Sequence, residues 1–352
     1  MRYGFIDSTS EKWCQMLSEI PHDFYHLPQY VALSAQHERG VAAAFVAEHG
    51  SCRVFIPFIL RDLPTWCPGG WRDAITPYGY ASPLLFAPSR ARESNRFFRE
   101  AIREFFTGLR ERKVVSAFLR LNPVLDVSPG VLHDEGTLVF HGQTVVIDLT
   151  LTEERLWQQT RAGHRNEINR AKRRGDTVEI DVDWAGMDDF YHAYTETMRR
   201  VGASDSYFFS RNYCRRLRES LQKYLHLFIV RIDGSIAAAG IFSELGGIVQ
   251  YHLSGTFDGF VRQYPTKIML DFVRRWAKER GNHYFHLGGG IGAAEDSLFR
   301  FKAGFSKLRA PFYTWRVVVD EEAYGLCLGQ WEAWQGHPAP CREAYFPAYR
   351  AA

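Results

Sequence analysis

The sequence predicts a mixed α/β (α+β) fold made of two copies of one structural unit. Three observations carry this prediction: a length of 352 residues, two amphipathic segments with the same helical pattern, and a strand-turn-strand run before each of them. A compact domain usually holds roughly 150 residues, so the length favours two domains. We place the copies at residues 1–150 and 151–319.

The first copy consists of three consecutive segments. Residues 45–58 form two β-rich runs around a Gly50-Ser51 turn, a pattern typical of a hairpin. Residues 95–111 follow with one apolar stripe at helical spacing, and residues 114–121 then form an apolar run that predicts a strand. The stripe consists of Phe97, Phe98, Ala101, Ile102, Phe105, Phe106 and Leu109.

The second copy repeats this order. Residues 227–242 surround a Gly234-Ser235 turn, residues 266–280 carry a helical stripe, and residues 284–287 predict a strand. Gly281 stands where a helix C-terminal cap is expected. A helix over 155–175 leads into this copy. The alternative to a duplication is chance, because amphipathic helices recur in any mixed protein.

The segment after residue 311 predicts a strand at 313–319 and then an irregular, aromatic-rich tail over about 320–352 that packs back on the first copy. Gly336, Pro338, Pro340 and Pro347 argue against a long final helix.

Composition is that of an ordinary globular protein, with 46% hydrophobic and 24% charged residues. Neither a signal peptide nor a run of ~20 apolar residues is recognisable, so we expect a cytoplasmic protein without membrane insertion. Six cysteines occur without a C-x-x-C pair, so we expect them to be reduced and structural. The net charge of +3 requires any polyanion contact to come from local clusters of cations.

A glycine run, Gly288, Gly289 and Gly290, ends the last predicted strand of the second copy. Without a Cβ in the way, a phosphate or another backbone can approach closely. The run does not fit a dinucleotide-binding G-x-G-x-x-G pattern. It is therefore either a substrate-binding loop or simply a flexible one.

Lys302 follows this loop between Phe301 and Phe305. A cation at a pocket wall can bind phosphate or stabilise the oxyanion that forms when an amine attacks an ester. The alternative is a solvated surface lysine.

A basic run precedes the second copy. On a helix, Arg161, Arg165 and Lys172, with His164 nearby, lie roughly on one side, and Arg170 adds a further cation. These residues predict a phosphate contact, although charge runs are more often solvated faces.

Neither a catalytic triad nor a metal site is recognisable. His283 and His286 are three residues apart on a strand and point to opposite faces, so they are poor ligands for one metal. His252 is either a general base or a hydrogen-bonded core residue. Tyr251 and His252 occupy opposite faces of their predicted strand, so one of them should face a cleft.

Four motifs together resemble the Fem family of peptidoglycan interpeptide-bridge transferases and the wider Fem-like tandem GNAT group. They are Asp73-x4-Tyr78-Gly79-Tyr80-x2-Pro83, Arg165-Asn166-Glu167-Ile168-x-Arg170-Ala171, Leu253-Ser254-Gly255, and Gly288-Gly289-Gly290 continuing to Leu298-x2-Phe301-Lys302-x-Gly304-Phe305. The last is the most specific, and the motifs cover nearly the whole chain.

This resemblance implies two tandem GNAT-like domains, aminoacyl-tRNA as donor in place of a bound cofactor, and a small-molecule or peptide amine as acceptor. It places Lys302 and Phe301 at the tRNA terminus and the reacting ester. Tyr251, His252, Tyr78, the three glycines and Phe305 are then candidate substrate-binding residues. The chain lacks the long helical hairpin arm of bridge-forming members, which leaves the acceptor open between cell-wall precursors and peptide-like natural products.

The donor is the remaining choice. GNAT enzymes that use acyl-CoA resemble one another in an R/Q-x-x-G-x-G/A loop that holds the pyrophosphate. No glycine occurs between Gly259 and Gly281, or between Gly79 and Gly108, so both such loops are missing. We therefore favour an aminoacyl-tRNA-dependent aminoacyltransferase over an acyl-CoA-dependent N-acyltransferase on the same fold, and both over a non-enzymatic binding module.

Overall fold

The computed structural model describes residues 1–67, 69–88, 92–125, 129–342 and 344–351. The chain divides into two compact units. Unit 1 consists of Met1–Phe140 and Phe312–Ala352, and unit 2 consists of His141–Pro311.

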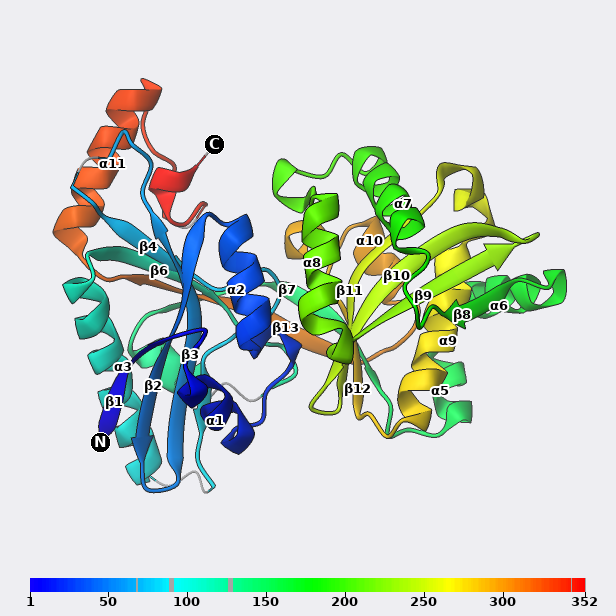
Figure 1. Cartoon of the computed structure of the whole chain (residues 1–352), viewed down its shortest axis with the longest axis horizontal. Coiled ribbons are helices and arrows are strands. Elements are labelled where there is room, and N and C mark those ends of the chain that lie inside the picture. Colours follow the sequence, from blue (N-terminus) through cyan, green and yellow to red (C-terminus); the bar gives the residue numbers. More distant parts are fainter. Residues whose placement is uncertain (68, 89–91, 126–128, 343, 352) are drawn as a thin grey trace. The chain divides into compact units, whose positions relative to one another are not determined.

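Unit 1 contains most of the N-terminal elements and the C-terminal helix (Figure 1). Its elements are β1 (Arg2–Asp7), α1 (Glu11–Glu19), α2 (Pro28–His37), β2 (Gly40–His49), β3 (Cys52–Asp62), β4 (Arg72–Ile75), β5 (Leu84–Phe86), α3 (Arg92–Glu111), β6 (Val114–Arg120), α4 (Pro129–Asp134) and α11 (Glu321–Gln335).

Unit 2 contains the central part of the chain. Its elements are α5 (Glu153–Gln159), α6 (Ala162–Arg174), β8 (Thr177–Ile180), α7 (Met187–Arg200), α8 (Arg211–Leu221), β9 (Leu225–Ile232), β10 (Ser235–Leu245), β11 (Ile248–Thr256), α9 (Pro265–Glu279), β12 (Tyr284–Gly288) and α10 (Ser297–Lys302). Two strands, β7 (Thr137–Asp148) and β13 (Arg309–Val318), run from one unit into the other.

Both units repeat one topology. In unit 1, β1, β2, β3 and β4 pair antiparallel in that order, and β6 returns through α3 to pair parallel with β4. In unit 2, β8, β9, β10 and β11 pair in the same way, and β12 returns through α9 to pair parallel with β11. We call β1 to β6 copy 1 and β8 to β12 copy 2. The predicted mixed α/β fold in two copies is confirmed.

The fifth strand of each sheet is exchanged in sequence. β7 follows copy 1 along the chain but pairs antiparallel with β12 of unit 2. β13 follows copy 2 but pairs antiparallel with β6 of unit 1. Each copy is therefore completed by the strand that comes after the other copy.

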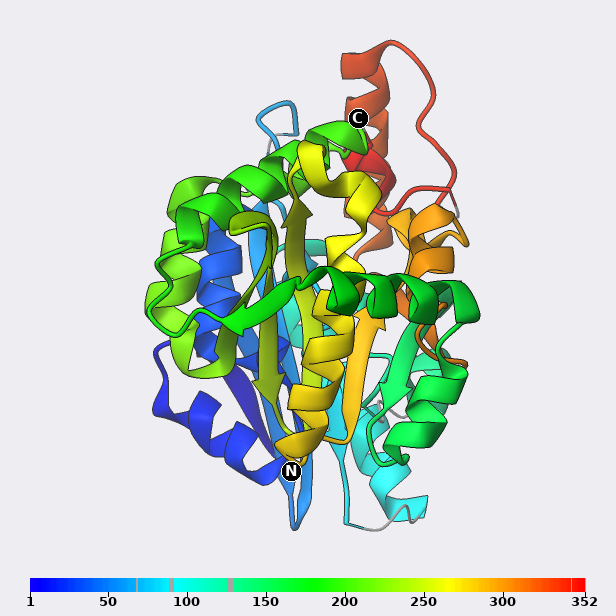
Figure 2. The same cartoon turned by 90° about the vertical axis from the view of Figure 1, so that its right-hand side faces the viewer.

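Helices cover both faces of each sheet. In unit 1, Trp13 of α1 packs on Phe55 and Phe105 of α3 packs on Phe58, and these two β3 residues face opposite ways. In unit 2, Gly255 of β11 abuts α7 while Gly240 of β10 abuts Met269 of α9. Figure 2 shows α9, in yellow, lying along the face of this sheet.

The predicted helices over 95–111 and 266–280 correspond to α3 and α9, and Gly281 caps α9 with φ +81° and an N–H bond to the Lys278 carbonyl. Two expectations were wrong. The helix predicted over 155–175 is two helices, α5 and α6, because the backbone at Thr160 is extended. The tail is not irregular throughout, because α11 occupies residues 321–335 before the chain turns at Gly336. Within the described residues, no helix combines the length and apolarity required to cross a membrane.

Candidate active site

The glycine run continues from β12 into a tightly packed loop. Gly288 has φ +78°, a conformation that favours glycine. A Cβ on Gly290 would lie 2.1 Å from the Ala294 carbonyl oxygen and 2.3 Å from Asp296 Oδ1, although the φ of Gly290, −82°, suits any residue. Gly290 is therefore required by close packing within the loop. The loop has a defined path from β12 to α10.

Asp296 fixes both ends of this loop. Its carboxylate caps α10 by accepting the Phe299 N–H at 2.8 Å, and it also accepts the Ile291 N–H at 3.0 Å. These two bonds help to hold the pKa of Asp296 below its usual value, although partial burial opposes them. The sequence signal for this cap, an acidic residue just before a helical run, was available and was not used.

Lys302, the last residue of α10, turns back onto the glycine loop. Its Nζ donates to the Gly289 carbonyl oxygen at 2.7 Å, and the residue is 9% exposed. Burial lowers the pKa of Lys302 to about 8, and the Asp296 carboxylate opposes the shift. The structure thus presents a buried cation against the backbone of a glycine loop.

Tyr251 lies beside this cation. The Lys302 Nζ is 5.8 Å from the centre of the Tyr251 ring, at the outer limit of a cation–π contact. The ring stacks on Phe242 at 5.3 Å, and its hydroxyl bonds to Ser254 Oγ. Burial raises the pKa of Tyr251 to about 12, so the phenol stays protonated.

His252 occupies a bulge, because Ile241 pairs with Leu253 and Phe242 pairs with Tyr251 across the two strands. Burial lowers the pKa of His252 to about 3, which keeps its imidazole neutral at ordinary pH. It is 6% exposed. These properties are those of a core histidine.

His164 joins α6 to the segment that carries Lys302. Its Nε2 donates to the Phe301 carbonyl oxygen at 2.8 Å, and its ring lies 4.7 Å from that of Phe305. A Cβ on Gly304 would lie 2.4 Å from the same Nε2, so a glycine is required there. Burial lowers the pKa of His164 to about 4. The expectation that His164 joins an exposed row of cations was wrong, since it is a buried anchor.

The predicted phosphate-binding cations have separate surroundings. Arg161 donates its backbone N–H to the Gly304 carbonyl at 2.7 Å, Arg165 bonds to the Trp157 carbonyl, and Lys172 pairs with Asp271 at 2.9 Å. Arg170 is exposed and lies nine residues, or two and a half turns, after Arg161. Arg161 is therefore the cation of this set that contacts the Lys302 segment.

Lys267, in the first turn of α9, was not among the predicted residues. Burial lowers its pKa, and the positive charge of Arg161 adds to the effect. Its Nζ lies 4.1 Å from the centre of the Tyr264 ring. Arg161 and Lys267 thus form a second positive region near His164. Its only sequence signal is one lysine after a proline, which is too common to be informative.

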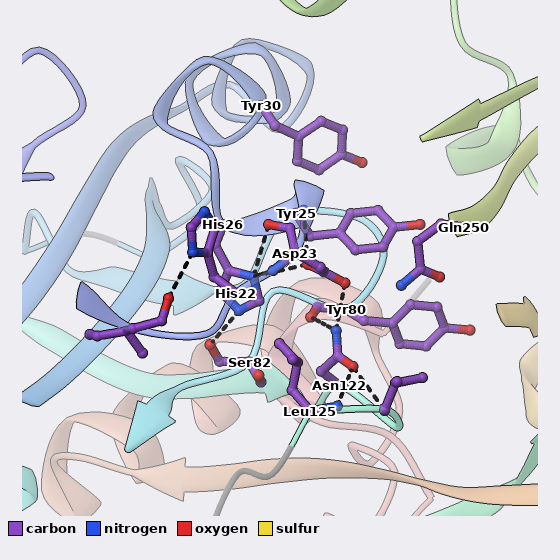
Figure 3. A network of polar contacts seen from close by, with 12 residues as sticks. His22, Asp23, Tyr25, His26, Tyr30, Tyr80, Ser82, Asn122, Leu125 and Gln250 are labelled. Atoms are coloured by element: carbon purple, nitrogen blue, oxygen red, sulfur yellow. Dashed lines mark hydrogen bonds and ion pairs between the residues drawn. The ribbon is translucent and has the colours of Figure 1, made fainter. Parts of the chain in front are cut away.

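Tyr78 belongs to unit 1, where a buried polar network holds its loop (Figure 3). Its carbonyl accepts from Tyr30, and a Cβ on Gly79 would meet the Tyr25 ring at 2.2 Å. The neighbouring residues are held by Asp23, whose carboxylate accepts from His26 Nδ1 at 2.9 Å, from the Tyr25 N–H at 3.0 Å and from Asn122 Nδ2 at 2.7 Å. His26 Nε2 also contacts the Ser82 carbonyl.

No group of three or more His, Cys, Asp or Glu side chains within the described ranges is arranged to hold a metal ion. The described groups near Lys302 are instead a cation, backbone carbonyls, phenol and phenyl rings. Such a set can bind and polarise a substrate oxygen.

Comparison with known proteins places these features in a family context. Residues 158–302 match the sequence profile of the family described as "Acetyltransferase (GNAT) domain", a match that includes α6 and ends at Lys302. No protein with a curated description matches the sequence.

Solved structures resemble the whole chain. FemX is similar with a TM-score of 0.69 and 12% identity, covering 93% of this chain and 99% of FemX. L-PGS from Bacillus licheniformis has a TM-score of 0.56 and 16% identity, covering 92% and 96%. The C-terminal domain (DUF2156) of a proposed lysylphosphatidylglycerol synthetase from Agrobacterium fabrum has a TM-score of 0.56 and 17% identity, covering 89% and 93%. The chain has the Fem-like tandem GNAT fold, as the sequence motifs predicted.

Proposed function

We propose that the chain is an aminoacyltransferase that moves an aminoacyl group from charged tRNA to an amine of a cell-wall precursor or a peptide-like natural product. The observation that carries this proposal is the buried Lys302, whose Nζ is 2.7 Å from the Gly289 carbonyl in a loop with little side-chain bulk. The GNAT acyltransferase fold and the likeness to FemX support it.

The reaction requires little from the protein because an aminoacyl ester is already activated. The amine attacks the ester carbonyl, an oxyanion forms, the bond to the ribose oxygen breaks, and the amine proton passes to that oxygen. With a pKa of about 8, Lys302 is roughly nine-tenths ammonium at pH 7, so it can stabilise the oxyanion. Phe301 and Phe305 shape the surroundings, and Tyr251 forms the neighbouring wall.

The cations have a separate role in the proposal. Arg161 is exposed and bonded through its backbone to Gly304, two residues after Lys302. A phosphate of the tRNA end held there would lie next to the segment that carries the reacting cation. Arg165, Arg170 and Lys172 extend positive charge along α6, where they would contact phosphates further from the ester.

A second candidate is an acyl-CoA-dependent N-acyltransferase. The match of residues 158–302 to a GNAT acetyltransferase domain favours it. The segment before α9 argues against it, because no glycine occurs between Gly259 and Gly281 to hold a pyrophosphate through backbone N–H groups.

Transfer of radiolabel distinguishes the donors. The purified chain is incubated with total tRNA charged with labelled amino acids, using host extract as acceptor, and ribonuclease-resistant, amine-linked label is measured beside a parallel reaction with labelled acetyl-CoA. We expect label from tRNA alone. Label from acetyl-CoA alone would replace the proposal with the second candidate, and label from neither would favour a binding module.

A further inference from the structure

Two buried cysteines of unit 1 lie side by side although they are far apart in sequence. The Sγ atoms of Cys67 and Cys327 are 3.0 Å apart and 260 residues separate them. Both are free thiols in the structure. The other four cysteines differ: Cys14 and Cys341 are exposed, Cys52 lies 3.8 Å from Ser94 Oγ, and Cys214 is buried.

The pair joins two elements that the fold otherwise connects only by side-chain packing. Cys67 lies in the loop between β3 and β4, and Cys327 lies on the buried face of α11 with Ala323 and Trp331. A second contact between the same elements is the stack of Trp66 on Trp334 at 6.1 Å. A bond between the sulfurs would therefore fasten the C-terminal helix to the edge of the unit 1 sheet.

We propose that Cys67 and Cys327 are a redox modification site that closes to a disulfide. The oxidant class is a small disulfide such as oxidised glutathione. The Cys67 thiolate attacks one glutathione sulfur and releases one glutathione, and the Cys327 thiolate then attacks Cys67 Sγ and releases the second. Two protein thiols and one oxidised glutathione thus give one protein disulfide and two reduced glutathiones.

The surroundings set the order of these steps. Cys327 is fully buried in an apolar cluster, and burial, with the neighbouring Cys67 as a second cause, raises the pKa of its thiol. Cys67 lies in a loop whose neighbours Thr65 and Gly69 are exposed. Local opening of this loop gives the oxidant access to Cys67 first, and closing of the loop brings Cys327 to the mixed disulfide.

The test uses the full chain with Cys14→Ser and Cys341→Ser, which leaves four thiols and removes both exposed ones. The folded protein is treated with oxidised glutathione, freed of reagent, unfolded and titrated for thiols. We expect the count to fall from four to two. Trypsin should release peptides 62–72 and 317–342 as one linked species, two hydrogen atoms lighter than their sum.

Oxidation should also raise the midpoint of thermal unfolding by roughly 5 °C, because a link between distant residues restricts the unfolded chain. The matched variant adds Cys67→Ser, a change in a loop, and should keep three thiols and show no rise. Four thiols after treatment of the folded protein, a stable glutathione adduct, a link to Cys214, or a link that forms only in denaturant would each overturn the proposal.

Discussion

Copy 1 and copy 2 diverge where the strand after the crossover helix ends. In copy 1, β6 is followed by Asn122, whose side chain binds Asp23 and the Tyr80 carbonyl in a dense buried network. In copy 2, β12 is followed by three glycines, and Lys302 reaches the carbonyl of Gly289. One topology therefore supports a polar lock in one copy and a buried cation over an open backbone in the other.

This difference assigns structural work to copy 1 and chemistry to copy 2. The Asp23 carboxylate accepts three hydrogen bonds and is 1% exposed, so its capacity is used within the fold. The Lys302 ammonium has three N–H donors, and the structure gives it one acceptor. A cation with donors to spare is suited to a substrate oxygen.

Asp23→Ala should give the largest loss of stability. The substitution leaves the Asn122 amide, the His26 ring and the Tyr25 N–H buried without their acceptor, so we expect a loss of about 3–5 kcal/mol in the free energy of unfolding, measured in denaturant. Asp134→Ala, which breaks an exposed ion pair with Arg99, is the control and should cost under about 1 kcal/mol. Equal costs would contradict the lock in copy 1.

His164 should make copy 2 sensitive to acid. Its pKa is about 4 in the folded state and about 6.5 when unfolded, so between these values the unfolded chain binds a proton that the folded chain does not. Stability is full above pH 6.5 and falls by at most about 1.4 kcal/mol per pH unit as the pH drops toward 4. Unfolding of wild type and His164→Gln from pH 7 to 4 isolates this contribution. Parallel curves would rule out the anchor.

Gly290→Ala tests the packing of the glycine loop. The added Cβ meets the Ala294 carbonyl oxygen and the Asp296 carboxylate, so we expect a cost of about 2 kcal/mol and a slower transfer reaction. Gly163→Ala, in an exposed turn of α6 with open space around it, should instead stabilise by about 0.5–1 kcal/mol. A loop that accepts the alanine without cost or loss of rate would be loose.

Asp296→Ala should have the smallest effect on stability. It removes the cap of α10 and the bond to Ile291, and the exposed loop can turn to water, so we expect about 1 kcal/mol. Asp296→Asn keeps an acceptor for one N–H and should recover about half of the loss. Thermal unfolding of both variants provides the measurement. No difference between them would mean that the cap is not made in solution.

Local patterns predicted much of the fold. The apolar stripes gave α3 and α9 to within three residues, and the Gly-Ser turns gave the β2–β3 and β9–β10 hairpins. These features depend on neighbours within a few residues, which a single sequence displays.

Features set by distant contacts were not predictable. The break between α5 and α6 lies beside Arg161, whose N–H binds Gly304, and no proline or glycine marks it. His164 looked like part of a cationic row because its partners Phe301 and Phe305 are more than 130 residues away. The helix α11 was missed because Gly325 and Gly329 weaken its pattern, and Gly336 ends the helix without preventing it.

The central claim is that Lys302 supplies the charge for acyl transfer, and a single-turnover assay with labelled aminoacyl-tRNA tests it directly. We expect Lys302→Ala to slow amide formation about 10²–10³-fold, with the wild-type rate falling as the pH rises through about 8 and the ammonium loses its proton. Lys307→Ala, an exposed lysine five residues away, should react like wild type. A Lys302→Ala protein that is folded and transfers at the wild-type rate would contradict the account.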